Sequence, residues 1–87
     1  MEVAFSSSFK RAFKKLVKGR RSLEETFWTK LEIFVGEPFD QRLKTHKLTG
    51  QLKDLWSFSV TYEIRVVFAI EDGRALFLDI GDHDSVY

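Results

Sequence analysis

Cysteine is absent from this chain of 87 residues, so neither a disulfide nor a thiolate metal site can form within it. The sequence also lacks an apolar run near the ~18 residues of a membrane-spanning helix, and its N-terminus has no apolar signal-peptide core. It contains no glycine-rich phosphate loop, no Ser or Cys nucleophile motif and no HExxH pair. We therefore expect a soluble, cytoplasmic protein with no membrane partner.

Aromatic residues are plentiful by contrast, with nine Phe and two Trp. Each buries a large area, which helps a chain too short to bury much of its surface. The length allows one domain, which we place at residues 1–87.

The net charge of +1 conceals an uneven distribution. Residues 1–53 carry twelve Lys and Arg against six Asp and Glu, whereas residues 54–87 carry two against seven. The basic half could face a polyanion such as nucleic acid. Solvated helix faces would give the same charge pattern, so charge alone leaves both interpretations open.

The N-terminal half reads as a strand followed by two amphipathic helices. Residues 3–5 form a short apolar edge strand, and the serines at 6–8 can cap a helix whose apolar residues recur at helical spacing. Gly19 stops this first helix. Ser22 and Glu25 have the spacing of a capping box that opens a second helix, and this helix ends at Gly36 and Pro38.

The C-terminal half reads as three strands, after a linker at 37–54 without clear periodicity. The candidates are residues 55–60, 64–70 and 75–80, with an Asp-Gly pair at 72–73 that predicts a hairpin between the last two. The order is β-α-α-β-β-β. It predicts an α+β fold in which two N-terminal helices pack on one face of a small, largely antiparallel sheet.

Arg65 stands out because it interrupts the apolar strand at 64–70. A buried guanidinium is costly unless it finds a carboxylate, water or a ligand anion. A salt bridge to Glu63 or Asp79 would satisfy it within the chain, whereas an open side of the sheet would let it bind a phosphate. The residues alone favour neither reading.

The chain has only two histidines, and their contexts differ. His46 lies in the basic linker between Lys44 and Lys47, where a histidine is more often solvated than catalytic. His83 follows a strand end, and Tyr87 comes four residues later, so this tail is a candidate site for proton transfer.

Carboxylates surround His83, at positions 79, 82 and 84. Together with the imidazole they could suggest a metal cluster. Their spacing fits no recognised ligand motif, and solvated carboxylates are the simpler reading. We therefore expect no metal site.

The order of several short motifs resembles the RelE superfamily of bacterial type II toxins, including its RelE/StbE, YafQ and YoeB branches. The similarity covers essentially the whole chain. The matching segments are Phe9-Lys10-Arg11, His46-Lys47-Leu48-Thr49-Gly50, Leu52-Lys53-Asp54-Leu55-Trp56-Ser57, Ile64-Arg65-Val66-Val67-Phe68 and Ile80-Gly81-Asp82-His83-Asp84-Ser85-Val86-Tyr87. The fold of this superfamily, which includes the ParE toxins, is the β-α-α-β-β-β arrangement derived above.

The resemblance implies a toxin that cleaves mRNA in the ribosomal A site, through attack of the RNA's own 2′-hydroxyl and without a metal or other cofactor. By position it implies that Arg65 holds the phosphate and that His83 is general acid or base. It further implies that His46 assists and that Tyr87 stacks on or orients the nucleotide.

The resemblance also implies partners. A cognate antitoxin would hold the toxin in a hetero-oligomer, and the ribosome and its mRNA would be the targets. Basic side chains would dock on their phosphates. They are Lys10, Arg11, Lys14, Lys15 and Lys18 of the first helix, with Lys44 and Lys47 of the linker.

Two features depart from the nuclease pattern and keep alternatives open. Trp56 and Phe58 stand where several family nucleases have lysines, and the carboxylates of Asp79, Asp82 and Asp84 near His83 would repel RNA. One alternative is a ParE-like poison of DNA gyrase that cleaves no RNA. The other is a degenerate toxin that only binds antitoxin.

Overall fold

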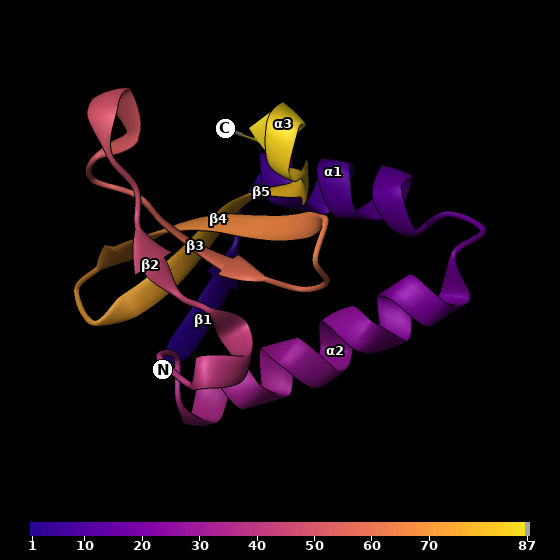
Figure 1. Ribbon diagram of the computed structural model, residues 1–87, viewed down its shortest axis with the longest axis horizontal. Helices are drawn as coiled ribbons and strands as arrows, with labels where there is room; N and C mark the ends of the chain where they lie inside the picture. Colours follow the sequence, from indigo (N-terminus) through magenta and orange to yellow (C-terminus); the bar gives the residue numbers. More distant parts are fainter. Residues whose placement is uncertain (87) are drawn as a thin grey trace.

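The computed structural model describes residues 1–86, which form a five-stranded sheet and two long helices (Figure 1). The elements in chain order are β1 (Glu2–Phe5), α1 (Ser7–Val17), α2 (Arg21–Gly36), the 3₁₀ turn η1 (Gln41–Leu43), β2 (His46–Lys47), the 3₁₀ turn η2 (Gly50–Leu52), β3 (Trp56–Ser59), β4 (Ile64–Glu71), β5 (Arg74–Asp82) and α3 (His83–Val86).

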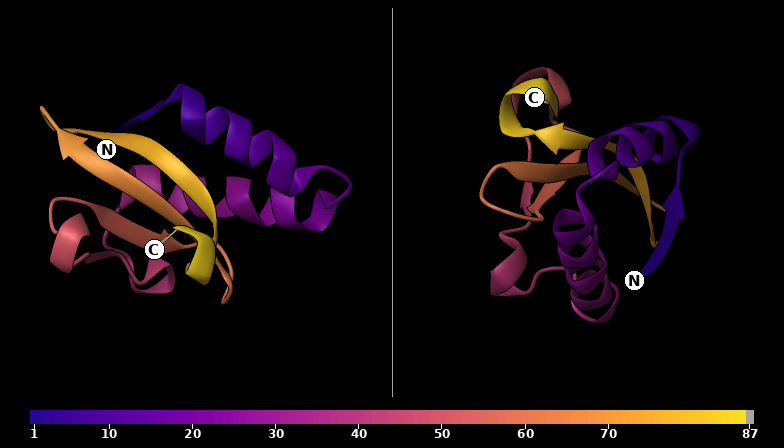
Figure 2. Two further views of the ribbon diagram at one scale, coloured as in Figure 1. Left: turned by 90° about the horizontal axis from the view of Figure 1, so that it is seen from above. Right: turned by 90° about the vertical axis from the view of Figure 1, so that its right-hand side faces the viewer.

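The sheet has the strand order β1-β5-β4-β3-β2. The edge strand β1 runs parallel to β5, and all other neighbours are antiparallel. Both long helices lie on the same side of the sheet (Figure 2), where their apolar residues join one core with those of β3, β4 and β5. The predicted α+β fold is confirmed.

The helix boundaries agree with the sequence in one helix and differ in the other. Ser6 caps α1 as predicted, with its hydroxyl accepting from the amide of Phe9 at 3.0 Å. The predicted capping box of α2 is wrong. The helix begins at Arg21, its N-cap residue is Arg20, and the Arg20 side chain makes no capping hydrogen bond. Gly19, at φ 71°, turns the chain so tightly that the amide of Arg20 still bonds to the carbonyl of Val17 at 2.8 Å. Ser22 is therefore already inside the first turn of α2.

The hairpin between β4 and β5 has the predicted two-residue turn. Asp72 and Gly73 both adopt positive φ, 52° and 75°, as a type I′ turn requires. This turn fixes the register in which Glu71 faces Arg74.

Two segments hold more structure than the sequence predicts. The linker contributes β2, which pairs with Trp56 and Ser57 at the start of β3 and extends the sheet by one short strand. The returning strand runs to Asp82 rather than to Ile80, because Gly81 and Asp82 continue the ladder opposite Arg65 and Ile64. The polar tail then turns into α3.

A bulge in β5 decides which side chains share a face. Phe68 pairs with Phe77, whereas Val67 pairs with Asp79, so Leu78 is the extra residue. An extra residue reverses the alternation of the strand beyond it. Ile80 consequently points into the core beneath the helices, and Gly81 shares the opposite face with Arg65.

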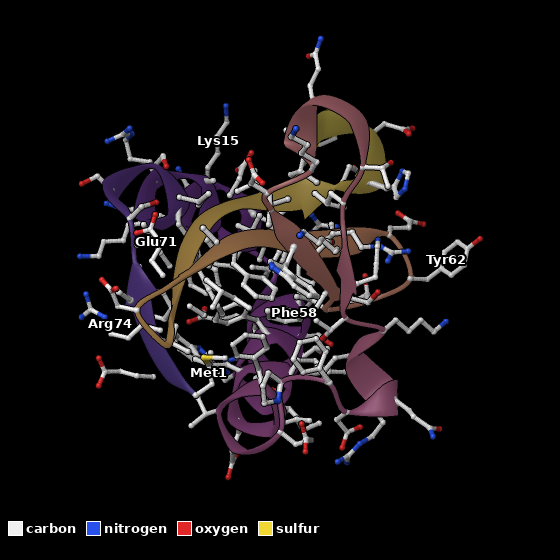
Figure 3. The ribbon with its side chains drawn as sticks, turned by 90° about the vertical axis from the view of Figure 1, so that its left-hand side faces the viewer. Met1, Lys15, Phe58, Tyr62, Glu71 and Arg74 are labelled. Carbon is white, nitrogen blue, oxygen red and sulfur yellow. The ribbon has the colours of Figure 1, made fainter. Side chains whose placement is uncertain are left out.

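Phe34 of α2 is the centre of the core. Its ring stacks on Phe58 at 4.9 Å between centroids and meets Phe68 and Phe77 edge-on at 5.0 Å and 5.5 Å. All four rings are fully buried, and Figure 3 places Phe58 in the interior between sheet and helix. These contacts fix α2 against the three central strands.

Replacing Phe34 with alanine is expected to destabilise the protein by about 3–5 kcal/mol, because a large cavity opens where sheet and helix meet. A loss of that size lowers the Tm of a domain this small by about 12 °C or more, which thermal unfolding followed by circular dichroism measures. The matched control is Val35→Ala, one residue along and half-exposed, which we expect to cost less than about 1 kcal/mol. Equal losses in the two variants would contradict this account of the core.

Candidate functional site

Arg65 occupies the middle of the sheet, on the face away from the helices. Its neighbours in β4, Ile64 and Val66, point into the core. Across the ladder it lies between Ser59 of β3 and Gly81 of β5. Gly81 has no side chain, so it contributes none to that flank of the guanidinium.

Within residues 1–86 Arg65 has neither an ion pair nor a hydrogen bond at its Nε, although that atom is buried. The salt bridge to Glu63 or Asp79 does not form, and the Asp79 carboxylate accepts instead from the amide of Ile80 at 2.8 Å. The hydroxyl oxygen of Ser59 is also buried without a partner in this part of the chain. Buried polar atoms nearly always have a hydrogen-bond partner. The unpartnered Arg65 Nε and Ser59 Oγ therefore favour a bound anion as their partner.

A pocket of about 460 Å³ opens beside Arg65 and contains His83. The first residue of α3, His83, is tied to the β3–β4 turn by its amide, which donates to the carbonyl of Glu63 at 3.0 Å. Its ring Nδ1 lies 3.6 Å from a carboxylate oxygen of Asp84, and its side chain is 55% exposed. The remaining lining residues are Tyr62, Glu63, Asp82 and Asp84. The predicted pair of Arg65 and His83 therefore shares one cavity.

A second pocket of about 200 Å³ adjoins the first, because Arg65 and Tyr62 line both. Its other lining residues are Lys30, Arg42, Lys44, Ser59 and Thr61. Tyr62 is 88% exposed and projects from the β3–β4 turn away from the body of the protein (Figure 3). The two cavities differ in charge: carboxylates line the first and cations line the second. We call the second one the basic pocket.

Arg42 is held in the basic pocket by a clasp with Asp40. Its Nε and Nη2 donate to the two carboxylate oxygens at 3.0 Å and 2.9 Å, and its amide donates to the same side chain. These side-chain bonds, followed by the amide bond, lower the pKa of Asp40 from 3.8 to about 2. Because the pKa of Asp40 is lowered, its salt bridge with Arg42 stabilises the fold fully above about pH 4. This stabilisation is lost as the pH falls through about 2.

His46 shares the sheet face of Arg65 but lines neither pocket. It pairs with Ser57, which in turn pairs with Val67, two residues along β4 from Arg65. Its Nδ1 lies 3.0 Å from the carbonyl oxygen of Lys44. The structure thus places His46 on the sheet face of Arg65, further along the sheet than His83.

The predicted RNA-binding cations divide among several surfaces. Lys44 lines the basic pocket. Lys47 points to the other face, with its ammonium 6.0 Å from the ring centroid of Trp56, which is half-buried against Phe39. Lys15 lies on α1, well away from Tyr62 (Figure 3), and lines a separate cavity with Gly81 and Asp82. Lys10, Arg11 and Lys14 of α1 are exposed, as is Lys18 directly after it.

Five residues that line the two pockets were not predicted from the sequence: Lys30, Arg42, Ser59, Thr61 and Tyr62. One signal was available, because alternation along β3 puts Ser59 on the face opposite Phe58. The others come from a helix, a linker and a turn, and nothing local marks them. The predicted role of Tyr87 lies outside the described residues.

Two kinds of feature are absent from the described part of the chain. No group of three His, Cys, Asp or Glu side chains among residues 1–86 is placed to hold a metal ion. No helix there is both long and apolar enough to cross a membrane.

Solved bacterial toxins have the same fold as this chain. YafQ from E. coli strain BL21(DE3) superposes with a TM-score of 0.81 at 16% identity, over 99% of this chain and 97% of that one. A YoeB/ParE toxin from Agrobacterium tumefaciens gives 0.78 at 18%, over 95% and 99%. A metal-bound toxin from Helicobacter pylori gives 0.76 at 21%, over 100% and 99%. Among curated proteins, none matches in sequence.

The fold is therefore the one found in the YafQ and YoeB/ParE toxins. The model of one family, the YafQ toxins of bacterial type II toxin–antitoxin systems, matches residues 1–87, and the chain belongs to that family. The resemblance found in the sequence is confirmed. Membership implies a cognate antitoxin as partner.

Proposed function

We propose that the protein is a ribosome-dependent endoribonuclease that cleaves mRNA by attack of a 2′-hydroxyl on the adjacent phosphate. The observation that carries this proposal is Arg65, which has no ion pair within residues 1–86 and lines the cavity that also holds His83. A cation held ready for a phosphate, beside a group that can transfer a proton, is what such a reaction requires.

In the proposed reaction a bond forms between the 2′-oxygen and phosphorus, and the bond from phosphorus to the 5′-oxygen breaks. The proton of the 2′-hydroxyl passes to a base, and an acid protonates the departing 5′-oxygen. The products are a 2′,3′-cyclic phosphate and a free 5′-hydroxyl. Arg65 stabilises the additional negative charge on phosphorus, and His83 is one of the two proton-transfer groups.

The remaining predicted residues have supporting roles in this proposal. His46 assists from further along the same sheet face, and Tyr87 stacks on or orients the nucleotide. The cations of the first helix and the linker dock on phosphates of the ribosome and its mRNA, a contact that weakens as salt rises.

Primer extension on mRNA tests the proposal after brief induction of the toxin without its antitoxin. We expect new 5′ ends within translated codons, and the same message with its start codon removed should stay intact. An intact translated message together with DNA double-strand breaks would contradict RNA cleavage and indicate gyrase poisoning. An absence of any growth defect would instead indicate a protein that only binds antitoxin.

A further inference from the structure

We propose that the basic pocket is a second phosphate site, which takes the phosphodiester next to the scissile one on the same RNA strand. This inference rests on the proposed function, because it treats RNA as the ligand. The pocket is lined by Lys30, Arg42, Lys44, Ser59, Thr61, Tyr62 and Arg65.

The charge of the pocket is suited to an anion. Four of its seven lining residues are cationic and none is acidic. Within residues 1–86 neither Lys30 nor Lys44 takes part in an ion pair. Lys30 is held toward the pocket by its ammonium, which donates to the carbonyl of Arg42 at 3.4 Å. Unpaired cations that converge on one cavity favour a negatively charged ligand.

Ser59 supplies the second, independent observation. Its side chain lines the pocket, the residue is only 7% exposed, and its hydroxyl has no partner in the described chain. Arg65 is the cross-strand neighbour of Ser59, and its buried Nε is the second donor without a hydrogen-bond partner in the described chain. One phosphate has enough acceptor oxygens for both donors, so a bound phosphodiester would satisfy two atoms that the fold leaves unsatisfied.

Thr61 completes the set of donors at the rim. Its hydroxyl oxygen accepts from the amides of Ile64 and Glu63 at 3.0 Å and 3.3 Å, which fixes the side chain and leaves the hydroxyl able to donate. The cavity, at about 200 Å³, is several times the roughly 30 Å³ that a water molecule occupies in the liquid. A phosphate therefore has room together with part of its ribose.

The basic pocket also offsets the repulsion between RNA and the carboxylates that line the pocket of His83. Glu63, Asp82 and Asp84 line the pocket of His83 and repel an RNA strand. A guanidinium offers five donors, so Arg65 can serve the phosphates on both of its sides. The basic pocket supplies attraction one phosphate away from the carboxylates, and it places the strand on a path from α3 across Arg65 toward η1.

Salt-dependent binding of a short single-stranded RNA tests the proposal. All of its riboses are 2′-O-methylated, so that it binds without being cleaved. In the Lys30→Gln/Lys44→Gln double variant we expect affinity to fall about tenfold at low salt. The slope of log K against log salt should shrink by about 0.7, the value for one phosphate contact on a single strand.

Two further variants sharpen the test. Ser59→Ala removes a neutral donor, so affinity should fall about threefold with no change of slope. Arg74→Gln is the matched control, since Arg74 pairs with Glu2 at the far end of β5 and should change neither quantity. The melting temperature of each variant shows that it is folded.

The outcomes separate this inference from the proposed reaction. A wild-type affinity and slope in the double variant would overturn the phosphate site, whether or not the toxin cleaves RNA. Weaker antitoxin binding with unchanged RNA binding would also overturn it and assign the pocket to the protein partner. A reduced slope in a toxin that cleaves no RNA would support the phosphate site and contradict the proposed reaction.

Discussion

Arg65→Met is expected to slow RNA cleavage by on the order of 10³-fold and to leave the protein as stable as before or more stable. The loss of rate follows from the role proposed for the guanidinium. Donors that are fixed in place for developing negative charge typically contribute about 10²–10³ each, and arginines in phosphoryl transfer contribute up to about 10⁵.

The effect on stability follows from the surroundings of Arg65. Its Nε is buried without a partner in the described chain, and such an atom costs about 1–3 kcal/mol. Methionine keeps the unbranched apolar stem and removes that atom. We therefore expect a gain of up to about 1 kcal/mol, or roughly 4–8 °C in Tm.

Cleavage by purified ribosomes programmed with a defined message, together with a thermal melt, measures both quantities on the same preparation. Arg74→Met is the control, since it removes an arginine from the same sheet that is exposed and paired with Glu2. It should leave cleavage unchanged. Full cleavage by Arg65→Met would exclude Arg65 from the reaction, and a large fall in Tm would show that the guanidinium is a structural group.

The fold was predictable from the sequence because each long element carries its own signal. The apolar spacing of α1, the Asp-Gly turn before β5 and the glycine after α1 act locally, and the structure confirms them. The first residue of α2 was not predictable from Ser22 and Glu25. Their capping pattern, with Ser22 as N-cap, competes with a turn at Gly19 and Arg20 that begins the helix two residues earlier.

The site was predictable only in part, because much of it depends on register. Arg65 and His83 are visible in the sequence as a charged residue within an apolar strand and an imidazole after one. That they share a cavity depends on the bulge at Leu78, which reverses the second half of β5 and puts Gly81 beside Arg65. No local propensity specifies that extra residue. The basic pocket depends on Lys30 and Arg42, which reach it from other elements.

His83→Gln is expected to slow cleavage by about 10²–10⁴-fold, the usual contribution of a positioned proton-transfer group. Glutamine keeps a polar side chain of similar size but cannot exchange a proton near neutral pH. The fold should survive, since the bond that ties α3 to the β3–β4 turn comes from the backbone amide of His83 and the side chain is half-exposed. An unchanged rate would remove His83 from the mechanism.

A sulfur-substituted substrate distinguishes the two possible roles of His83. When the departing 5′-oxygen is replaced by sulfur, the leaving group is a thiolate. The parent thiol has a pKa of about 8.5, far below the ~15.7 of water that an alkoxide resembles, so the thiolate departs without being protonated. If His83 is the general acid, His83→Gln should cleave this substrate nearly as fast as the wild type does. If His83 is the base, the deficit should persist, because the 2′-hydroxyl must still lose its proton.

His46→Gln is the matched comparison. It removes an imidazole that shares the face of Arg65 outside the pocket of His83, so its deficit with the ordinary substrate should be the smaller of the two.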